Sequence, residues 1–460
     1  MSGQNPWTVE ARELAKLAVP MAATQLAQMI ILATDTMMLG HYSQDALAAA
    51  ALGNTMFILA WLFGSGLPFA VSPIIAHIQG EQSADIKARD GRDVRIAVRM
   101  GLWSVLLSTP PLLLFLFYTR DILILCGEDP ALAQQAAHFM SGLAWGLPFA
   151  MAFQVLRSFS TALSRAVPPL VVMALAVLFN AAGDYALIFG HFGLPRLGLF
   201  GSGLASAASN IFAFAVMLLI CLAMPALRQY RILHRLMQPH WGVLAELFKL
   251  GLPIGITMVF EVSLFNGATL AMGYFGVASI AAHQIAITIP SLTFMVPLGI
   301  GLAATVRVGM AAGAGDAAAA RRAGFTAIAM GALFMCATAI ALLLWPRAIA
   351  TLWLPDVAQN AQVLALAVRF LFVAAAFQLA DGLQVTAALS LRGLKDASMP
   401  MWLAGASYWL VGAPTCLLLG FTFGLEGFGV WLGLAAGLFV AAILLTTRFA
   451  LLSKRAVASQ

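Results

Sequence analysis

Twelve long apolar stretches run through this sequence, and few charged residues interrupt them. Of the 460 residues, 62% are hydrophobic and only 10% are charged. A soluble chain carries roughly 25% charged residues, so this chain lacks the polar side chains that would cover a surface in water. We therefore predict an integral membrane protein. The same composition excludes a soluble enzyme, a nucleic-acid-binding protein and a secreted disulfide scaffold.

The apolar stretches have the length of membrane-spanning helices. A helix needs about 20 mostly apolar residues to cross a bilayer. The apolar residues are continuous and do not alternate with polar ones, which indicates helices rather than the strands of an outer-membrane barrel. The predicted spans lie near residues 14–40, 46–78, 94–118, 132–156, 167–190, 202–225, 247–275, 279–307, 323–345, 360–390, 399–420 and 427–451.

Basic residues gather on one side of this twelve-span topology. The connection between the second and third spans holds Lys87, Arg89, Arg92, Arg95 and Arg99. Further basic groups follow the sixth, eighth, tenth and twelfth spans, whereas the loops on the other side are mostly acidic. Because cytoplasmic loops are enriched in Lys and Arg, we predict that both termini are cytoplasmic. The polar N-terminal segment indicates no removable signal peptide.

The second half of the chain repeats the first. Residues 13–20, Glu-Leu-Ala-Lys-Leu-Ala-Val-Pro, return as residues 246–253, Glu-Leu-Phe-Lys-Leu-Gly-Leu-Pro. Five of these eight positions are identical at an offset of 233 residues. The same offset places Gly66 on Gly299. Such self-similarity predicts that each half is one copy of a duplicated unit.

Farther along the chain the offset changes by a few residues. Phe153-Gln154 matches Phe377-Gln378 at an offset of 224, so a short insertion or deletion separates the halves. Each half holds six predicted spans, an even number, which gives both halves the same topology. A pseudo-two-fold axis along the membrane normal should therefore relate them, as in transporters that alternate access by rocking one lobe against the other.

We accordingly predict an all-α integral membrane fold. Twelve transmembrane helices would form two pseudo-symmetric six-helix lobes around a central cleft. The N-lobe would span residues 1–225, a cytoplasmic linker residues 226–246, and the C-lobe with a cytoplasmic tail residues 247–460.

Four acidic residues lie well inside the predicted spans: Asp35, Asp184, Glu261 and Asp381. A carboxylate in the hydrocarbon core costs on the order of 3 kcal/mol even on insertion scales, so each requires a stabilising role. One interpretation is structural, in which a protonated or hydrogen-bonded acid bridges two helices. The other is functional, in which the acids bind a transported cation.

Polar neighbours accompany all four acids. They are Gln28 before Asp35, Asn180 before Asp184, Ser263 and Asn266 after Glu261, and Gln378 and Gln384 around Asp381. Carboxylate and amide oxygens suit a proton or a hard cation such as Na⁺. Burial favours the neutral carboxyl group and a nearby cation favours the charged one, so protons and metal cations compete for such a site. That competition is a physical basis for antiport.

No motif for catalysis or for an organic cofactor is found. The sequence has no phosphate-binding loop, no His-Glu-x-x-His and no Gly-x-Ser-x-Gly. The four cysteines are widely separated and suit neither a zinc site nor a redox pair. We expect no enzyme activity and no cofactor apart from a coupling ion. Four residues near span ends are expected to reach the interface or to pair between helices: His138, Arg157, Arg165 and Arg369.

Several blocks of the sequence together resemble the NorM-type branch of the multidrug and toxic compound extrusion (MATE) family. They are Pro253 with Glu261-Val262-Ser263-Leu264-Phe265, Ala281-Ala282-His283-Gln284, Arg307-Val308-Gly309 and Ser390-Leu391-Arg392-Gly393-Leu394-Lys395-Asp396. The resemblance covers nearly the whole chain. It implies a bacterial inner-membrane antiporter that exports organic cations, such as dyes and fluoroquinolone-like drugs, in exchange for Na⁺ or H⁺.

The resemblance also implies roles for single residues. It implies an N-lobe cation site of Asp35, Asn180, Asp184 and Ser206, a C-lobe site of Glu261 and Asp381 for Na⁺ or H⁺, and a ligand contact at Gln284. Ser206 stands where many relatives have Thr, which keeps the hydroxyl oxygen. Phe377 stands where some relatives have Tyr, which removes an oxygen from the neighbourhood of Asp381.

The alternative function is a flippase for lipid-linked precursors, from the same superfamily. Such a protein would also have paired six-helix lobes, but its cleft should be basic to hold pyrophosphate. The intramembrane charge here is mostly acidic, which favours cationic substrates. A receptor or a structural membrane protein has no need for duplicated lobes. The expected partners are small organic cations and the lipid bilayer, with no nucleic acid, and the expected state is a monomer.

Overall fold

The computed structural model describes residues 5–84, 91–354 and 359–458, and among these it contains helices and no strand. Twelve helices within the described residues are long and apolar enough to cross a membrane. The predicted all-α fold with twelve spans is thereby confirmed. Most helices extend several residues beyond the predicted apolar cores, since polar residues continue the helical turns at the ends.

The helices of the first half run in chain order. They are α1 (Pro6–Tyr42), α2 (Gln44–Ala84), α3 (Arg92–Phe117), α4 (Thr119–Leu125), α5 (Pro130–Leu143), the 3₁₀ turn η2 (Ala144–Gly146), α6 (Leu147–Ala162), α7 (Val167–Phe189), α8 (Gly198–Ala223) and α9 (Pro225–Arg228). Together α5, η2 and α6 form one span, Pro130–Ala162.

The second half follows the same plan. Its elements are α10 (Trp241–Tyr274), α11 (Val277–Gly313), α12 (Ala317–Leu344), α13 (Pro346–Thr351), α14 (Ala361–Gly393), α15 (Ser398–Ala406), the π-helical segment η3 (Ser407–Gly412), α16 (Ala413–Leu417), the π-helical segment η4 (Leu418–Thr422) and α17 (Glu426–Ala458). The segment from α15 to η4 forms a single span, Ser398–Thr422.

Local sequence signals explain several helix ends. Asp129 caps α5, since its side chain accepts from the backbone N–H groups of Ala131 and Leu132 at 2.9 and 3.1 Å. Asp316 caps α12 in the same way through Ala319. Gly190 ends α7 with a φ of 80°, a left-handed conformation that favours glycine.

The chain divides into two compact units. We call Ala23–Gly255 the N-unit, and Met1–Ala22 with Ile256–Gln460 the C-unit. The boundaries fall inside α1 and α10, so each of these helices supplies residues to both units. This division differs from the continuous segments predicted for the lobes. Moreover, α10 begins at Trp241, so the last residues assigned to the 226–246 linker belong to that helix.

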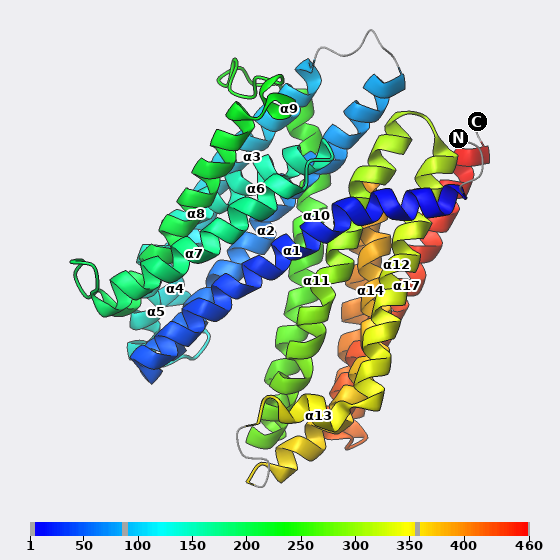
Figure 1. Cartoon of the computed structure of the whole chain (residues 1–460). Coiled ribbons are helices and arrows are strands. Elements are labelled where there is room, and N and C mark those ends of the chain that lie inside the picture. The colour runs from blue at the N-terminus through cyan, green and yellow to red at the C-terminus, as the bar shows by residue number, and fades with distance from the viewer. Residues whose placement is uncertain (1–4, 85–90, 355–358, 459–460) are drawn as a thin grey trace. The chain divides into compact units, whose positions relative to one another are not determined.

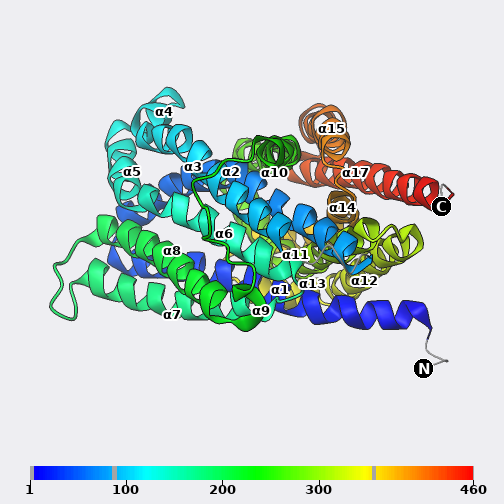
Figure 2. The same cartoon turned by 90° about the horizontal axis from the view of Figure 1, so that it is seen from above.

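One helix lies at the centre of each unit. In the N-unit α6 packs against α2, α3 and α8, and in the C-unit α14 packs against α11, α12 and α17. Figure 1 shows α12, α14 and α17 side by side, and Figure 2 shows α7 beside α8. The repeat relates α6 to α14, because Phe153-Gln154 lies on α6 and Phe377-Gln378 lies on α14.

A close helix contact also recurs in both units. In the N-unit, Gly66 on α2 approaches the backbone of Gly255 on α10 so closely that no Cβ would fit. In the C-unit, Gly299 on α11 makes the same approach to Ala22 on α1. The offset of 233 relates Gly66 to Gly299, and it also relates Ala22 to Gly255. The contact therefore supports the repeat that the sequence predicts.

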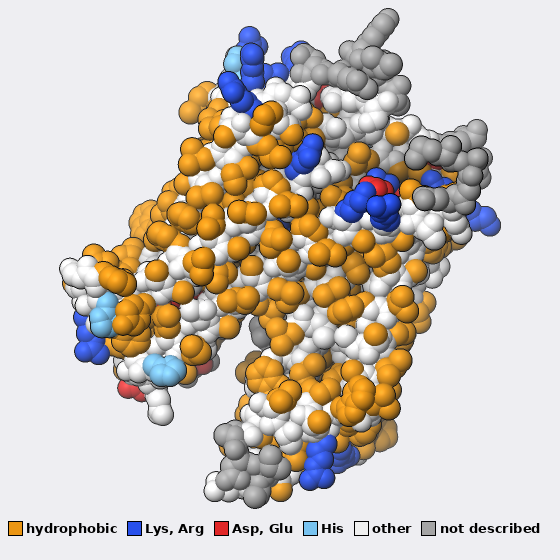
Figure 3. All heavy atoms as spheres, viewed as in Figure 1, with side chains coloured by type: hydrophobic (Ala, Val, Ile, Leu, Met, Phe, Trp, Pro, Cys, Tyr) orange, Lys and Arg blue, Asp and Glu red, His pale blue; other side chains and the backbone are white. Residues whose placement is uncertain are grey.

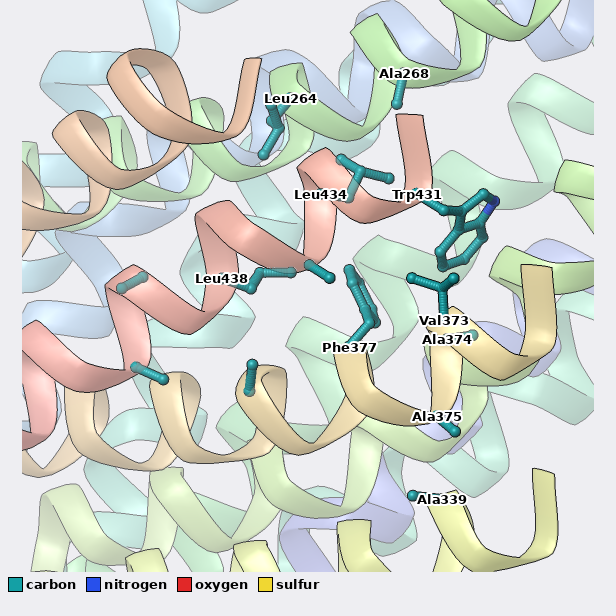
Figure 4. Packing of buried hydrophobic residues seen from close by; sticks show 14 of the residues in the cluster. Leu264, Ala268, Ala339, Val373, Ala374, Ala375, Phe377, Trp431, Leu434 and Leu438 are labelled. Carbon is teal, nitrogen blue, oxygen red and sulfur yellow. The ribbon is translucent and has the colours of Figure 1, made fainter. Parts of the chain in front are cut away.

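Apolar side chains cover the helices outside as well as inside. Leu178, Leu219 and Leu270 are more than half exposed, as expected for side chains that face lipid. Figure 3 shows hydrophobic side chains along the helices and most Lys and Arg side chains near helix ends. Figure 4 shows the packed interior of the C-unit, where Phe377 and Trp431 lie together with ring centroids 5.6 Å apart.

Candidate functional site

Three helices of the N-unit bring a group of polar side chains together. We call this group the N-cluster: Asp35 on α1, Asn180 and Asp184 on α7, and Ser202 and Ser206 on α8. All five side chains are buried. The Ser206 hydroxyl donates to Asp35 Oδ2 at 2.8 Å. Asn180 and Asp184 lie close enough to Asp35 to influence its charge, and Ser202 does so for Asp184.

Most polar atoms of the N-cluster lack a hydrogen-bond partner among the described residues. They are Asp35 Oδ1, both side-chain polar atoms of Asn180, both carboxylate oxygens of Asp184, and Ser202 Oγ. Buried polar atoms in proteins are normally paired, so such a concentration indicates that something else satisfies them. Carboxylate, amide and hydroxyl oxygens form the ligand set of a hard cation, and two adjacent carboxyl groups can instead share a proton.

A second polar group lies in the C-unit. We call it the C-cluster: Glu261 on α10, Asp381, Gln384 and Arg392 on α14, and Tyr408 on η3. The Gln384 amide donates to Glu261 Oε1 at 3.2 Å, and the Tyr408 hydroxyl donates to Gln384 Oε1. Asp381 and Arg392 both act electrostatically on Glu261. Asp381 Oδ1 has no hydrogen-bond partner among the described residues.

Gln378 extends this polar stripe by one turn along α14. It is fully buried, and its Oε1 accepts from the hydroxyls of Thr293 at 2.6 Å and Thr338 at 3.2 Å. These bonds join α14 to α11 and α12. They fix the rotation of α14 and thereby the direction in which its acidic face points.

The two clusters differ in charge balance. Arg392 acts electrostatically on Glu261, so a positive charge partly offsets the acids of the C-cluster. Within the described residues, neither Asp35 nor Asp184 forms an ion pair with Lys or Arg. Two ionised carboxylates side by side in an apolar medium repel each other, so the N-cluster has the greater need for a bound proton or metal cation.

The structure assembles most of the residues predicted for the site, and it separates one of them. Asp35, Asn180, Asp184 and Ser206 meet in the N-unit, and Glu261 meets Asp381 in the C-unit. Gln284 is exposed on α11, and its backbone oxygen accepts from the Thr288 hydroxyl at 2.7 Å. Phe377 belongs to the aromatic packing around Trp431 and not to the C-cluster.

Sequence analysis missed Tyr408, Ser202 and Arg392. Tyr408 is fully buried and lies in a π-helical segment, a backbone form often found at functional sites. In the sequence, Arg392 stands out only as part of the block Ser390–Asp396. No spacing rule connects these residues with acids on other helices, because only the folding of the helices brings them together.

Comparison with known proteins places the chain in a family. The MatE family model matches residues 20–186 and 253–418. The two matches begin 233 residues apart, the offset of the sequence repeat. The probable multidrug resistance protein NorM of Mesorhizobium japonicum is 43% identical over 97% of this chain and 95% of its own length. That of Brucella suis is 42% identical over 98% and 94%.

Solved structures show the same fold. A eukaryotic MATE transporter superposes with a TM-score of 0.85 and 22% identity, covering 98% of this chain and 99% of that one. An outward-facing multidrug resistance MATE transporter of the MOP superfamily gives a TM-score of 0.85 at 17% identity over 98% and 97% of the two chains. The chain thus belongs to the MatE family, in its NorM-type branch, and this is a family of multi-pass membrane transporters and not of enzymes.

Proposed function

We propose that this protein is a multidrug efflux antiporter of the bacterial inner membrane. It exports organic cations such as dyes and fluoroquinolone-like drugs, and it takes up Na⁺ or H⁺ in exchange. The relatives named NorM are called multidrug resistance proteins, which supports the substrate class. Both termini lie in the cytoplasm under this proposal, because the basic loops lie on that side.

One observation carries the coupling mechanism: Asp35 and Asp184 are buried side by side without a basic partner among the described residues. The pair is stable when it holds a cation and strained when both groups are ionised and empty. A proton, a metal cation and a cationic drug therefore compete for one negative site. We assign the coupling step to the N-cluster, and we assign Glu261 and Asp381 to a second cation site partly balanced by Arg392.

The membrane potential sets how much work one coupling ion can do. A potential of 100 mV acting on one elementary charge supplies about 2.3 kcal/mol. For a neutral substrate this sustains a gradient of roughly 50-fold. A monovalent cationic drug exchanged one-for-one for a monovalent ion moves no net charge, so the ion gradient alone drives its export.

Ethidium efflux from proteoliposomes tests the proposal directly. A Na⁺ gradient and a pH gradient are imposed separately on the purified wild-type protein. Efflux driven only by Na⁺ supports a metal site, and efflux driven only by the pH gradient supports a proton carrier. Efflux under neither gradient contradicts antiport and favours a flippase.

Matched variants then assign the site. Asp35→Asn and Asp184→Asn remove one negative charge each from the N-cluster and should abolish coupled efflux. Asp45→Asn is the control, because Asp45 is exposed at the start of α2. If Asp35→Asn and Asp184→Asn transport with unchanged ion dependence, the N-cluster is not the coupling site.

A further inference from the structure

A buried arginine in the N-unit has no acidic partner among the described residues. Arg157 on α6 is only 3% exposed. Its Nη2 donates to Oε1 of Gln25 on α1, and its Nη1 donates to Oε1 of Gln154 at 3.4 Å. Within the described residues, no carboxylate pairs with it. A guanidinium group keeps its positive charge in proteins, so the N-unit holds a permanent buried cation.

The surroundings of Arg157 are polar but neutral. Gln154 Nε2 donates to the Ser158 hydroxyl at 3.5 Å, and that hydroxyl donates to the backbone oxygen of Pro68 at 3.0 Å. Gln25, Gln154 and Ser158 are all buried. Amide oxygens offset the desolvation of a buried charge less well than an anion does. The guanidinium also has five N–H donors, and its bonds to Gln25 and Gln154 leave capacity for a bidentate anion.

The sequence repeat shows that this charge is inverted between the halves. At the offset of 224 that relates Gln154 to Gln378, Arg157 falls on Asp381. One unit therefore carries Gln-x-x-Arg on its central helix, and the other carries Gln-x-x-Asp. Corresponding positions of the duplicated halves thus present opposite charges to their surroundings.

Positive and negative groups are also separated along one helix of the N-unit. Gln25, which contacts Arg157, and Asp35, which belongs to the N-cluster, both lie on α1. Ten residues of helix separate them, a distance of about 15 Å along the axis. The N-unit consequently holds a buried anionic group and a buried cationic group at two levels of α1, the arrangement that the two ends of a zwitterion would require.

We propose that Arg157 binds the carboxylate of zwitterionic substrates whose amine end is drawn to the N-cluster. The inference rests on the proposed multidrug antiport and specifies its substrate class. Arg157 makes the carboxylate a recognised feature of the substrate, whereas acidic side chains alone would disfavour it. Gln25 and Gln154 orient the guanidinium and replace the carboxylate as partners when no substrate is bound.

The experiment compares three substrates in proteoliposomes: a fluoroquinolone with a free carboxylate, its methyl ester, and ethidium. The ester keeps the amine and the ring system but has no carboxylate. We expect the wild-type protein to export the free acid about tenfold more efficiently than the ester, the gain typical of a charged hydrogen bond. A transporter that selects only for positive charge gives the reverse order.

Variants locate the effect at Arg157. Arg157→Gln should lose the preference for the free acid while its export of the ester and of ethidium stays within about twofold of wild type. Arg157→Lys should keep part of the preference, because it keeps the charge without the fork of donors. Arg165→Gln is the matched control, since Arg165 is exposed eight residues farther along the chain. This control should retain the wild-type preference.

The outcomes separate the two proposals. Equal export of acid and ester by the wild type, or equal loss of all three substrates in Arg157→Gln, overturns the role of Arg157. Export of none of the three substrates by the wild type, under any ion gradient, overturns the antiport proposal itself. If Arg157→Gln does not fold, the comparison of acid and ester in the wild type still shows whether the transporter recognises the carboxylate of its substrate.

Discussion

Arg307 and Glu10 form a two-point ion pair within the C-unit. The arginine Nε donates to Oε1 at 2.8 Å, and Nη2 donates to Oε2 at 2.7 Å. Glu10 is 7% exposed, and the pair joins the start of α1 to the end of α11. Parallel charged hydrogen bonds of this kind are strong and geometrically specific. The pair therefore anchors the first turns of α1 in the C-unit.

Glu10→Gln should lower the thermal stability of the purified protein, because it leaves a partly buried guanidinium without its anion. We expect a loss of about 2 kcal/mol, measured as a lower melting temperature in detergent. Glu13→Gln is the control: Glu13 pairs with Lys16 at an exposed position, where ion pairs contribute about 0–1 kcal/mol. Similar melting temperatures for Glu10→Gln and wild type would show that the pair contributes little.

Ser206→Ala removes the hydroxyl that donates to Asp35 Oδ2. We expect ion-coupled ethidium efflux to fall by about tenfold, since Asp35 loses a charged hydrogen bond and is repositioned in the N-cluster. The control is Ser209→Ala on the same helix, because the Ser209 hydroxyl donates to the backbone oxygen of Ala205 at 2.8 Å. Equal efflux in both variants would show that the hydroxyl does not position Asp35.

Tyr408→Phe interrupts the chain of hydrogen bonds from Tyr408 through Gln384 to Glu261. Gln384 Oε1 loses its donor and the amide is free to turn away from Glu261, so we expect about tenfold slower transport with normal expression. Tyr274→Phe provides the comparison, because Tyr274 is 82% exposed. Wild-type transport rates in Tyr408→Phe would show that transport requires the acids and Arg392 of the C-cluster but not the Tyr408 hydroxyl.

Gly299→Ala should destabilise the contact between α11 and α1. A Cβ at residue 299 would lie 2.6 Å from the backbone nitrogen of Ala22, so one of the helices must move. We expect a loss of about 1–3 kcal/mol, the usual effect of overpacking. In Gly267→Ala the added Cβ meets nothing within 4 Å, and helix propensity alone should stabilise by up to about 1 kcal/mol. Melting temperatures of the two variants should therefore move in opposite directions.

Much of this protein could be predicted from the sequence. Hydropathy located all twelve spans. The repeat of residues 13–20 at 246–253 has the same offset as the two segments that match one family model. The cost of a charge in hydrocarbon identified Asp35, Asp184, Glu261 and Asp381 as residues that require partners. These properties belong to single residues or short segments, so they are visible without a fold.

The tertiary structure alone decided which partners those residues meet. It brought the hydroxyl of Ser206 to Asp35 and the Tyr408–Gln384 pair to Glu261. Against Arg157 it placed two glutamines, and no acid of the described residues. It also placed the boundaries of the compact units inside α1 and α10. Helices of similar hydropathy can pack in many rotations, and only the packed arrangement fixes which polar groups from distant segments face one another.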